Sequence, residues 1–366
     1  MYTGDVPGNW PGREKGYKMS KETLEWLNTN TLIGFSGKRG KFWHYRESMQ
    51  GGEPNHYADA VPVADIQRRL FNFQLVETPL YIVVPCDIDE ATTVTVDGGP
   101  AKMVTVEDRK AIRASDSDDV LGIFKGGYQV SQYTQALLED MEAIAGHGAE
   151  FASAGLLANR AVAWVQLEAR ETLTACGVEF RPFLMGVDSC NGSLARTYNK
   201  GNTVVGCDNT MAQSLLSSLA IFKLKHTKFA RFDADTVRDA LGVLEEIGQE
   251  FTDSIETLTN WAVTDADWAK FLDAVCKFDA DAKTTRSATI AQNKRDDLQN
   301  LWDNDTRVNP WKGTAFGVIQ ATNTWGQHVQ TVRGATRADR NMMAAITGAS
   351  YKVDADMLKT LELVTV

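Results

Sequence analysis

The spacing of apolar residues changes along this chain, and that change restricts the folds open to it. Within residues 80–124, and again within 151–199, apolar and polar residues alternate in short runs, which is the period of a β-strand. From Val237 onwards, apolar residues recur every three or four positions, which is the period of an amphipathic helix. Strands followed by a block of helices are typical of α+β proteins. The pattern therefore predicts an α+β fold with an antiparallel β-sheet core and a helical C-terminal layer.

Turn residues between the short runs support antiparallel hairpins. Residues 97–100 (DGGP), 115–118 (SDSD) and 191–192 (NG) have the composition of hairpin connections. Helices are predicted at 131–145 and 209–219, and separate strands at 103–106 and 111–114. The helix at 209–219 follows several strands, so the core has a β-β-β-α-like order.

Three regions follow from these patterns. Residues 1–75 form an aromatic-rich N-terminal extension, 76–231 an α+β core with β hairpins, and 232–366 a helical C-terminal region.

No apolar run approaches the ~20 residues of a membrane helix, and the N-terminus lacks the apolar stretch of a secretory signal. The five cysteines are odd in number and widely spaced, which favours plain buried thiols. We therefore expect a cytosolic protein that does not bind a membrane.

The formal net charge of −10 is concentrated in one part of the chain. Between Asp233 and Asp305 there are 17 acidic and 7 basic residues, whereas the rest of the chain has 31 of each. Basic residues outnumber acidic ones from Gly177 to Arg231. Because the charge is so uneven, an acidic chain of this kind still has a region suited to an anionic ligand.

Familiar catalytic motifs do not occur in the sequence. It has no phosphate-binding loop, no dinucleotide fingerprint, no HExxH zinc helix and no GxSxG nucleophile elbow. The five histidines are far apart, with no partner at ligand spacing. Asp-Ala-Asp begins at four positions, where carboxylates either cap helices or bind Mg²⁺ as in a nuclease. We predict that these carboxylates cap helices. The sequence therefore predicts no metal, no cofactor and no catalytic residue. The four positions are Asp233, Asp265, Asp279 and Asp354.

A set of basic side chains around the predicted hairpins is the candidate binding site. Lysines alternate with apolar residues from position 222, and two arginines lie on neighbouring predicted strands. Such a surface can contact the phosphates of a nucleic acid; the alternative is an ordinary solvated face of the sheet. The predicted nucleic-acid contacts are Arg181, Arg196, Lys200, Lys223, Lys225 and Lys228.

Several segments, in their order, resemble the phage/plasmid-like protein family, a domain of unknown function found in actinobacterial phages and plasmids. The segments are GIFKGGYQ at 122–129, FASAG at 151–155, DSCNGSLAR at 188–196, VVGCDNT at 204–210 and NPWKGTAF at 309–316. The resemblance implies a phage protein in the bacterial host cytoplasm, without an assigned reaction. The order of hairpin, strands and helix is also similar, at the level of fold, to single-strand annealing proteins of the Red-beta and eukaryotic recombination-mediator type.

Three functions are open at this point. The leading hypothesis is a non-enzymatic protein that binds single-stranded DNA and acts as a homo-oligomer in recombination or replication. The alternative is an accessory protein that binds a host protein through its acidic helices. A metal-dependent nuclease is a third hypothesis, since acidic residues are plentiful.

Overall fold

A computed structural model describes most of the chain. The described residues are 24–39, 45–86, 94–97, 99–146, 148–204, 210–211, 221–228, 230–241, 244–277, 285–332, 340 and 349–365. They form antiparallel sheets and helices, so the prediction of an α+β fold with an antiparallel core is confirmed.

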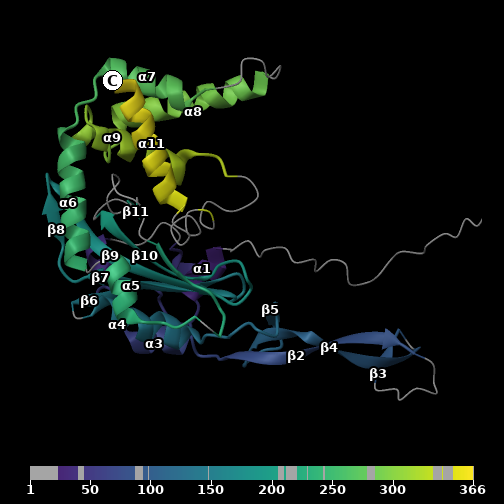
Figure 1. Cartoon of the computed structure of the whole chain (residues 1–366). Helices are drawn as coiled ribbons and strands as arrows, with labels where there is room; N and C mark the ends of the chain where they lie inside the picture. Colours follow the sequence, from purple (N-terminus) through teal and green to yellow (C-terminus); the bar gives the residue numbers. More distant parts are fainter. Residues whose placement is uncertain are drawn as a thin grey trace, which may run out of the picture.

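The main sheet has eight strands and forms the centre of the molecule (Figure 1). Its order is β1-β6-β7-β9-β10-β11, with β12 also beside β10 and β8 beside β9. Every strand pair in it is antiparallel. The strands are β1 (Thr31–Ile33), β6 (Ala149–Leu157), β7 (Val162–Ala169), β8 (Leu173–Ala175), β9 (Val178–Ser189), β10 (Arg196–Val204), β11 (Thr210–Met211) and β12 (Ile221–Leu224).

A second sheet extends away from the body as an arm (Figure 1). It contains β2 (Leu75–Pro85), β3 (Val94–Val96), β4 (Gly99–Ala114) and β5 (Val120–Lys125), with β4 paired to the other three. The sequence predicted two strands within β4, at 103–106 and 111–114, because charged residues separate the two apolar runs. The strand continues through them since both faces of this ribbon are largely exposed, and a charged side chain there is not buried.

Helices cover both faces of the main sheet. On one face, Ile66, Leu137, Met141 and Val237 pack against strand residues such as Val165. On the other face, Leu27 packs against Trp164 and Phe183. The elements concerned are α1 (Leu24–Asn30), α3 (Val63–Arg69), the π-helical turn η3 (Thr134–Glu139) with α4 (Asp140–Ala145), and α5 (Ala234–Leu241), while α2 (Ser36–Arg39) and η2 (Glu47–Met49) are short connections.

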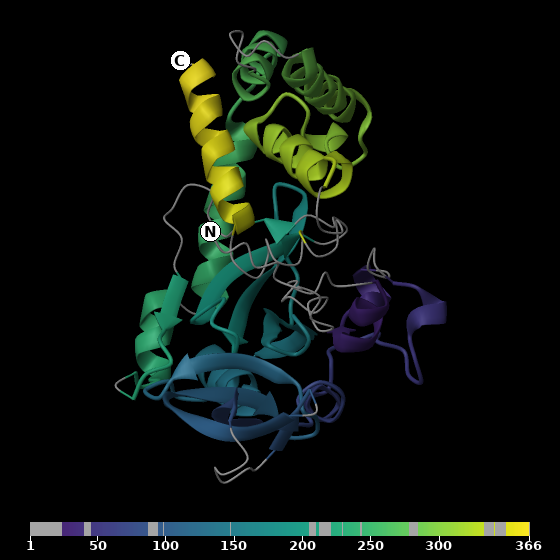
Figure 2. The same cartoon turned by 90° about the vertical axis from the view of Figure 1, so that its right-hand side faces the viewer.

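The remaining helices form a lobe at the other end of the main sheet from the arm (Figure 2). Stacked Trp268 and Trp302 lie in its core, which also includes Phe180 of β9. The predicted helical C-terminal layer is thus present. Its elements are α6 (Leu244–Asn260), α7 (Asp265–Val275), α8 (Thr285–Asn304), η4 (Asn309–Trp311), α9 (Ala315–Thr324), the π-helical turn η5 (Trp325–Val329) and α11 (Ala349–Thr365).

The N-terminal region is part of the fold, at least from Leu24. Strand β1 pairs with β6, and Leu32, Ile66 and Leu70 belong to the same core as the sheet. The predicted boundary at residue 75 therefore does not separate an extension from a core. The boundary at 231 coincides with the first C-terminal helices, but Val237 and Ile247 also pack into the sheet core.

Two sequence-based predictions are wrong in detail. A helix was predicted to begin at Asn209, yet Thr210–Met211 is a strand paired with β10; the rest of that predicted helix lies outside the described residues. Asp354 was predicted to cap a helix but lies inside α11 and is buried. Asp233 does accept a hydrogen bond from Thr236 at the start of α5, Asp265 is the first residue of α7, and Asp279 is not described.

Among the described helices, none is both long and apolar enough to cross a membrane.

Candidate functional site

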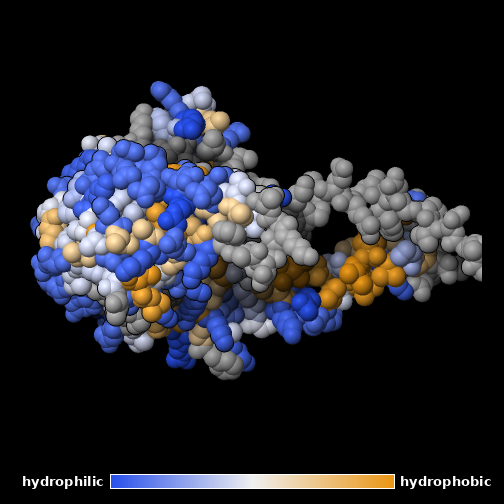
Figure 3. Space-filling model, turned by 90° about the horizontal axis from the view of Figure 1, so that it is seen from above, coloured by the Kyte–Doolittle hydropathy of each residue, from blue (hydrophilic) through white to orange (hydrophobic). Residues whose placement is uncertain are grey.

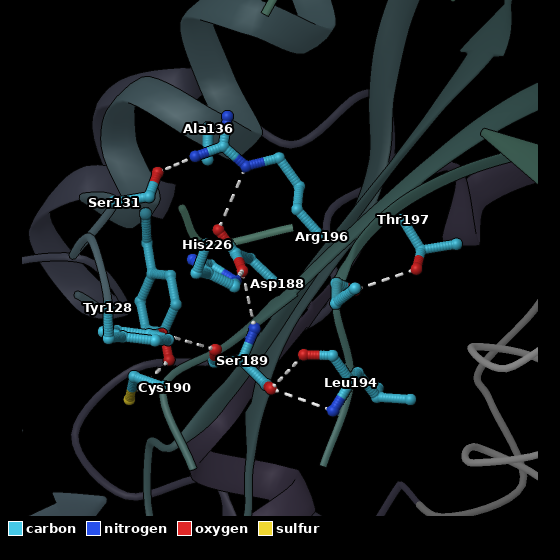
Figure 4. Close-up of polar contacts among 12 residues, drawn as sticks. Tyr128, Ser131, Ala136, Asp188, Ser189, Cys190, Leu194, Arg196, Thr197 and His226 are labelled. Atoms are coloured by element: carbon cyan, nitrogen blue, oxygen red, sulfur yellow. Dashed lines mark hydrogen bonds and ion pairs between the residues drawn. The ribbon is translucent and has the colours of Figure 1, made fainter. Parts of the chain in front are cut away.

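A network of charged side chains lies where β9 turns into β10 (Figure 4). Asp188, near the end of β9, is only 1% exposed. The Arg196 guanidinium, at the start of β10, donates from Nε to Asp188 Oδ2 at 3.2 Å and from Nη1 to Asp140 Oδ2 at 3.0 Å. It also donates from Nη2 to the Ser131 hydroxyl. The network therefore links the hairpin to the helix that covers the sheet.

A histidine completes this network on the other oxygen of Asp188. His226 Nε2 lies 2.8 Å from Asp188 Oδ1, and the backbone N–H of Ser189 donates to the same oxygen at 2.8 Å. The His226 ring stacks on Tyr128 at 4.9 Å between centroids, and Tyr128 stacks on Phe124 at 3.8 Å. Both carboxylate oxygens of Asp188 are thus satisfied, as a buried charge requires.

Burial has a strong effect on the groups that titrate here. It raises the pKa of the Tyr128, Tyr133 and Tyr198 hydroxyls, and it raises the pKa of the Cys190 thiol to about 11. Burial also raises the pKa of Asp140, while the hydrogen bond from Gln135 and the positive charge of Arg196 act to lower it. Because a thiol reacts as its thiolate, Cys190 is not a nucleophile at neutral pH. The network positions the hairpin, and its tyrosines and thiol stay protonated.

Three of the six predicted phosphate contacts are not on an open surface. Arg181 is 1% exposed; its Nε donates to Thr172 at 2.9 Å and its guanidinium lies over the Phe35 ring. Arg196 belongs to the network above, and its side chain is 13% exposed. Lys200 lies 3.3 Å from Glu250 of α6, also with a side chain that is 13% exposed. Arg181 in particular is corrected to a buried residue, because β9 is covered on both faces.

The other three predicted contacts are exposed. Lys223 lies on β12 and Lys225 directly follows the strand, while Phe222 and Leu224, which alternate with these lysines, pack against the core. Lys228 is exposed a few residues further along. Strand alternation explains this arrangement, since successive side chains point to opposite faces. The exposed lysines Lys223, Lys225 and Lys228 are the part of the predicted site that the fold leaves accessible, and we call them the β12 lysines.

The segment that carries the β12 lysines also contains His226, one of three stacked rings. The isolated bridge between Tyr128 and Thr227 joins the two segments, and the stacked rings of Phe124, Tyr128 and His226 are partly exposed. Lys125 is exposed at the end of β5. Cations and half-buried rings therefore occur on the same segments, with Lys223 and Lys225 on the face of the strand opposite Phe222, Leu224 and His226.

Sequence reasoning missed Asp188, Asp140 and His226. Asp188 could have been noticed, because an acid at the end of the run FLMGV needs a cation once that run is buried on both faces. His226 and Asp140 gave no such signal, since their partner is distant in sequence.

Metal and cysteine chemistry add little to the site. Within the described part of the chain, no group of three or more His, Cys, Asp or Glu side chains is placed to hold a metal ion. Cys190 and Cys276 are buried as predicted, whereas Cys86 is half-buried and Cys176 is exposed.

A family model for a domain of unknown function, DUF932, matches residues 120–347 of the sequence. The chain belongs to the DUF932 family. The match begins at the first residue of β5 and includes the charge network, the β12 lysines and most of the helical lobe, whereas β2–β4 of the arm precede it. DUF932 is an uncharacterised family, so the expectation of a family without an assigned reaction is confirmed. Searches of curated proteins and of solved structures give no match.

Proposed function

We propose that this DUF932 protein is a non-enzymatic single-stranded DNA-binding protein of the annealing type, acting as a homo-oligomer in recombination or replication. Its proposed setting is a phage protein in the bacterial host cytoplasm. The observation that carries the proposal is the exposure of Lys223, Lys225 and Lys228 on a segment that also contains the half-buried, stacked ring of His226.

This combination suits a flexible, anionic strand. Lys223 and Lys225 are two residues apart along a strand direction, so their Cα atoms are roughly 7 Å apart on one face. Proteins that bind single strands combine cations that follow the phosphates with aromatic rings on which bases stack. The network of Asp188, Arg196 and His226 supports the proposal by fixing the segment that carries the lysines.

Fluorescence anisotropy with a labelled single-stranded oligonucleotide at two salt concentrations tests the proposal. We expect binding that weakens as salt rises, because neutralised phosphates release counterions. The double variant Lys223→Glu, Lys225→Glu should bind at least about tenfold more weakly. The matched control is Lys352→Glu, Lys359→Glu, which makes the same charge change at exposed positions of α11.

Lysines on an edge strand also protect a sheet from edge-to-edge association. Light scattering of the Lys223→Glu, Lys225→Glu variant separates that role from DNA binding. Wild-type protein that fails to bind the oligonucleotide at low salt, or equal affinity of the two double variants, would reject the DNA proposal.

A second candidate function is binding of a host protein through the acidic lobe. Exposed carboxylates occur along its helices, and the lobe is strongly hydrophilic when viewed from above (Figure 3). Examples are Glu246, Asp253, Glu256, Asp273 and Asp296. One stoichiometric partner recovered from host lysate, with no nucleic acid retained, would favour this function. Mg²⁺-dependent cleavage of DNA would instead favour a nuclease.

A further inference from the structure

The arm exposes apolar side chains that a solvated β-ribbon does not need. Figure 1 shows β2 and β4 leading away from the body, and Figure 3 shows a continuous hydrophobic stretch along the arm. Side chains with relative exposures between 38% and 51% include Tyr81, Ile82, Val83, Val104, Val120 and Ile123. Scattered apolar residues on a surface are ordinary, but a contiguous set marks an interaction site.

Both faces of the ribbon take part. Tyr81, Ile82 and Val83 are consecutive, so they point alternately to the two faces, yet they are 46%, 51% and 47% exposed. Val104 lies opposite Ile82 across the ribbon and continues the patch. Together these side chains expose on the order of several hundred Å², approaching the ~800 Å² that each partner contributes to a standard interface.

The outer half of β2 is also an edge strand. Its pairing with β4 runs from Tyr81–Thr105 to Pro85–Ala101, and no other strand among the described residues pairs with β2. An exposed edge offers backbone N–H and C=O groups to another strand. Natural edge strands are commonly protected by charges, but residues 78–86 (TPLYIVVPC) contain none.

We propose that this edge pairs with the same edge of a second copy of the chain, antiparallel and about a twofold axis at Ile82, the middle of the run 78–86, so that Ile82 lies opposite its own copy. An isologous contact needs a self-complementary surface, and the uncharged run 78–86 places no like charges opposite each other. Pro79 and Pro85 bound the run, and each lacks the N–H needed to continue a ladder. The contact is therefore limited in length and closes as a dimer.

This inference rests on the homo-oligomer of the proposed function and gives it a surface. Mass photometry without DNA should give twice the 40.3 kDa mass of one chain. Ile82→Glu and Ile82→Lys should each give the mass of one chain, because like charges then meet at the axis. An equimolar mixture of the two variants should restore the dimer. The matched control is Ile290→Glu, at an apolar side chain of α8 that is 55% exposed.

Other outcomes overturn the proposal. A wild-type monomer would do so, as would a dimer that Ile82→Glu leaves intact, or two variants that stay monomeric when mixed. Unchanged circular dichroism and melting temperature of each variant show that it is folded. DNA binding is measured separately, so a failed dimer and a failed DNA proposal give different results.

Discussion

At the scale of single residues, Asp188 is central because its two oxygens have different partners. Oδ2 accepts from Arg196, and Oδ1 faces His226 and accepts from the Ser189 backbone. Among the described residues, loss of this one charge leaves the Arg196 cation with Asp140 as its remaining carboxylate partner.

We expect Asp188→Asn to lower the free energy of unfolding by about 3 kcal/mol, because removing one member of a buried charge pair leaves the other uncompensated. Urea unfolding measures the change. Asp118→Asn, at an exposed acid in the turn between β4 and β5, is the control and should shift stability by less than about 0.5 kcal/mol. Equal midpoints for the two variants would contradict the importance of the network.

The cysteines give a second prediction at this scale. Burial raises the pKa of Cys190 to about 11 in the folded protein, so its thiolate forms only as pH approaches that value. Alkylation at pH 8 should label exposed Cys176 and spare Cys190. Since the raised pKa favours the thiol in the fold, its stabilising effect is complete below the unfolded pKa and is lost as pH rises toward 11. Mass spectrometry of the labelled peptides shows which cysteines were alkylated. Rapid labelling of Cys190 in the native protein would contradict the prediction.

How far residues could be predicted depended on whether the decisive partner was local. The alternation of lysine with apolar residues was sufficient to predict that Lys223 and Lys225 are exposed, because one strand sets which way its side chains point. Arg181 follows the same local rule, but β9 is covered on both faces, and Phe35, which lies against the Arg181 guanidinium, is far away in sequence. One of the two carboxylate partners of Arg196, Asp140, lies 56 residues away, so no spacing rule could have found it.

At the scale of elements, α7 shows how the sequence fixes the start of a helix. The Thr264 hydroxyl accepts from the Asp267 backbone N–H, and the Asp267 carboxylate accepts from the Thr264 backbone N–H, which is a capping box. We expect Thr264→Ala to cost about 1 kcal/mol in the free energy of unfolding. The control Thr257→Ala, on the exposed side of α6, should cost less, because its hydroxyl bonds a carbonyl already within the helix. Urea midpoints compare the two; a larger loss at Thr257 would refute the capping argument.

Elements were predictable where turns and apolar period agreed. The hairpins at 115–118 and 191–192 and the helix within 131–145 follow from local signals, and the structure contains them. The joined strand β4 was not predictable from period alone, because its exposed ribbon tolerates the charged residues that otherwise mark a break. The strand Thr210–Met211 depends on pairing with β10, which is a tertiary contact.

At the scale of the whole molecule, the three regions predicted from sequence share their cores. Leu32 and Ile66 from the first region, Val165 from the second and Val237 from the third lie in one cluster. In the core of the helical lobe, the ring centroids of Phe180 from β9 and Phe251 from α6 are 4.6 Å apart. The sequence pattern marks where strands give way to helices. A region folds independently only when its hydrophobic core does not cross the boundary to the next region.

The central region alone should therefore fail to fold. A fragment of residues 76–231 loses β1, α3, α5 and α6, and with them the side chains that cover the main sheet. Its exposed strand faces should bind the dye ANS and give no cooperative thermal transition, as expected when specific packing is lost. The control is a fragment of residues 24–365, which keeps every described element and should melt cooperatively. A sharp transition in fragment 76–231 would show that the middle region is a domain, and the shared clusters would then be contacts between domains.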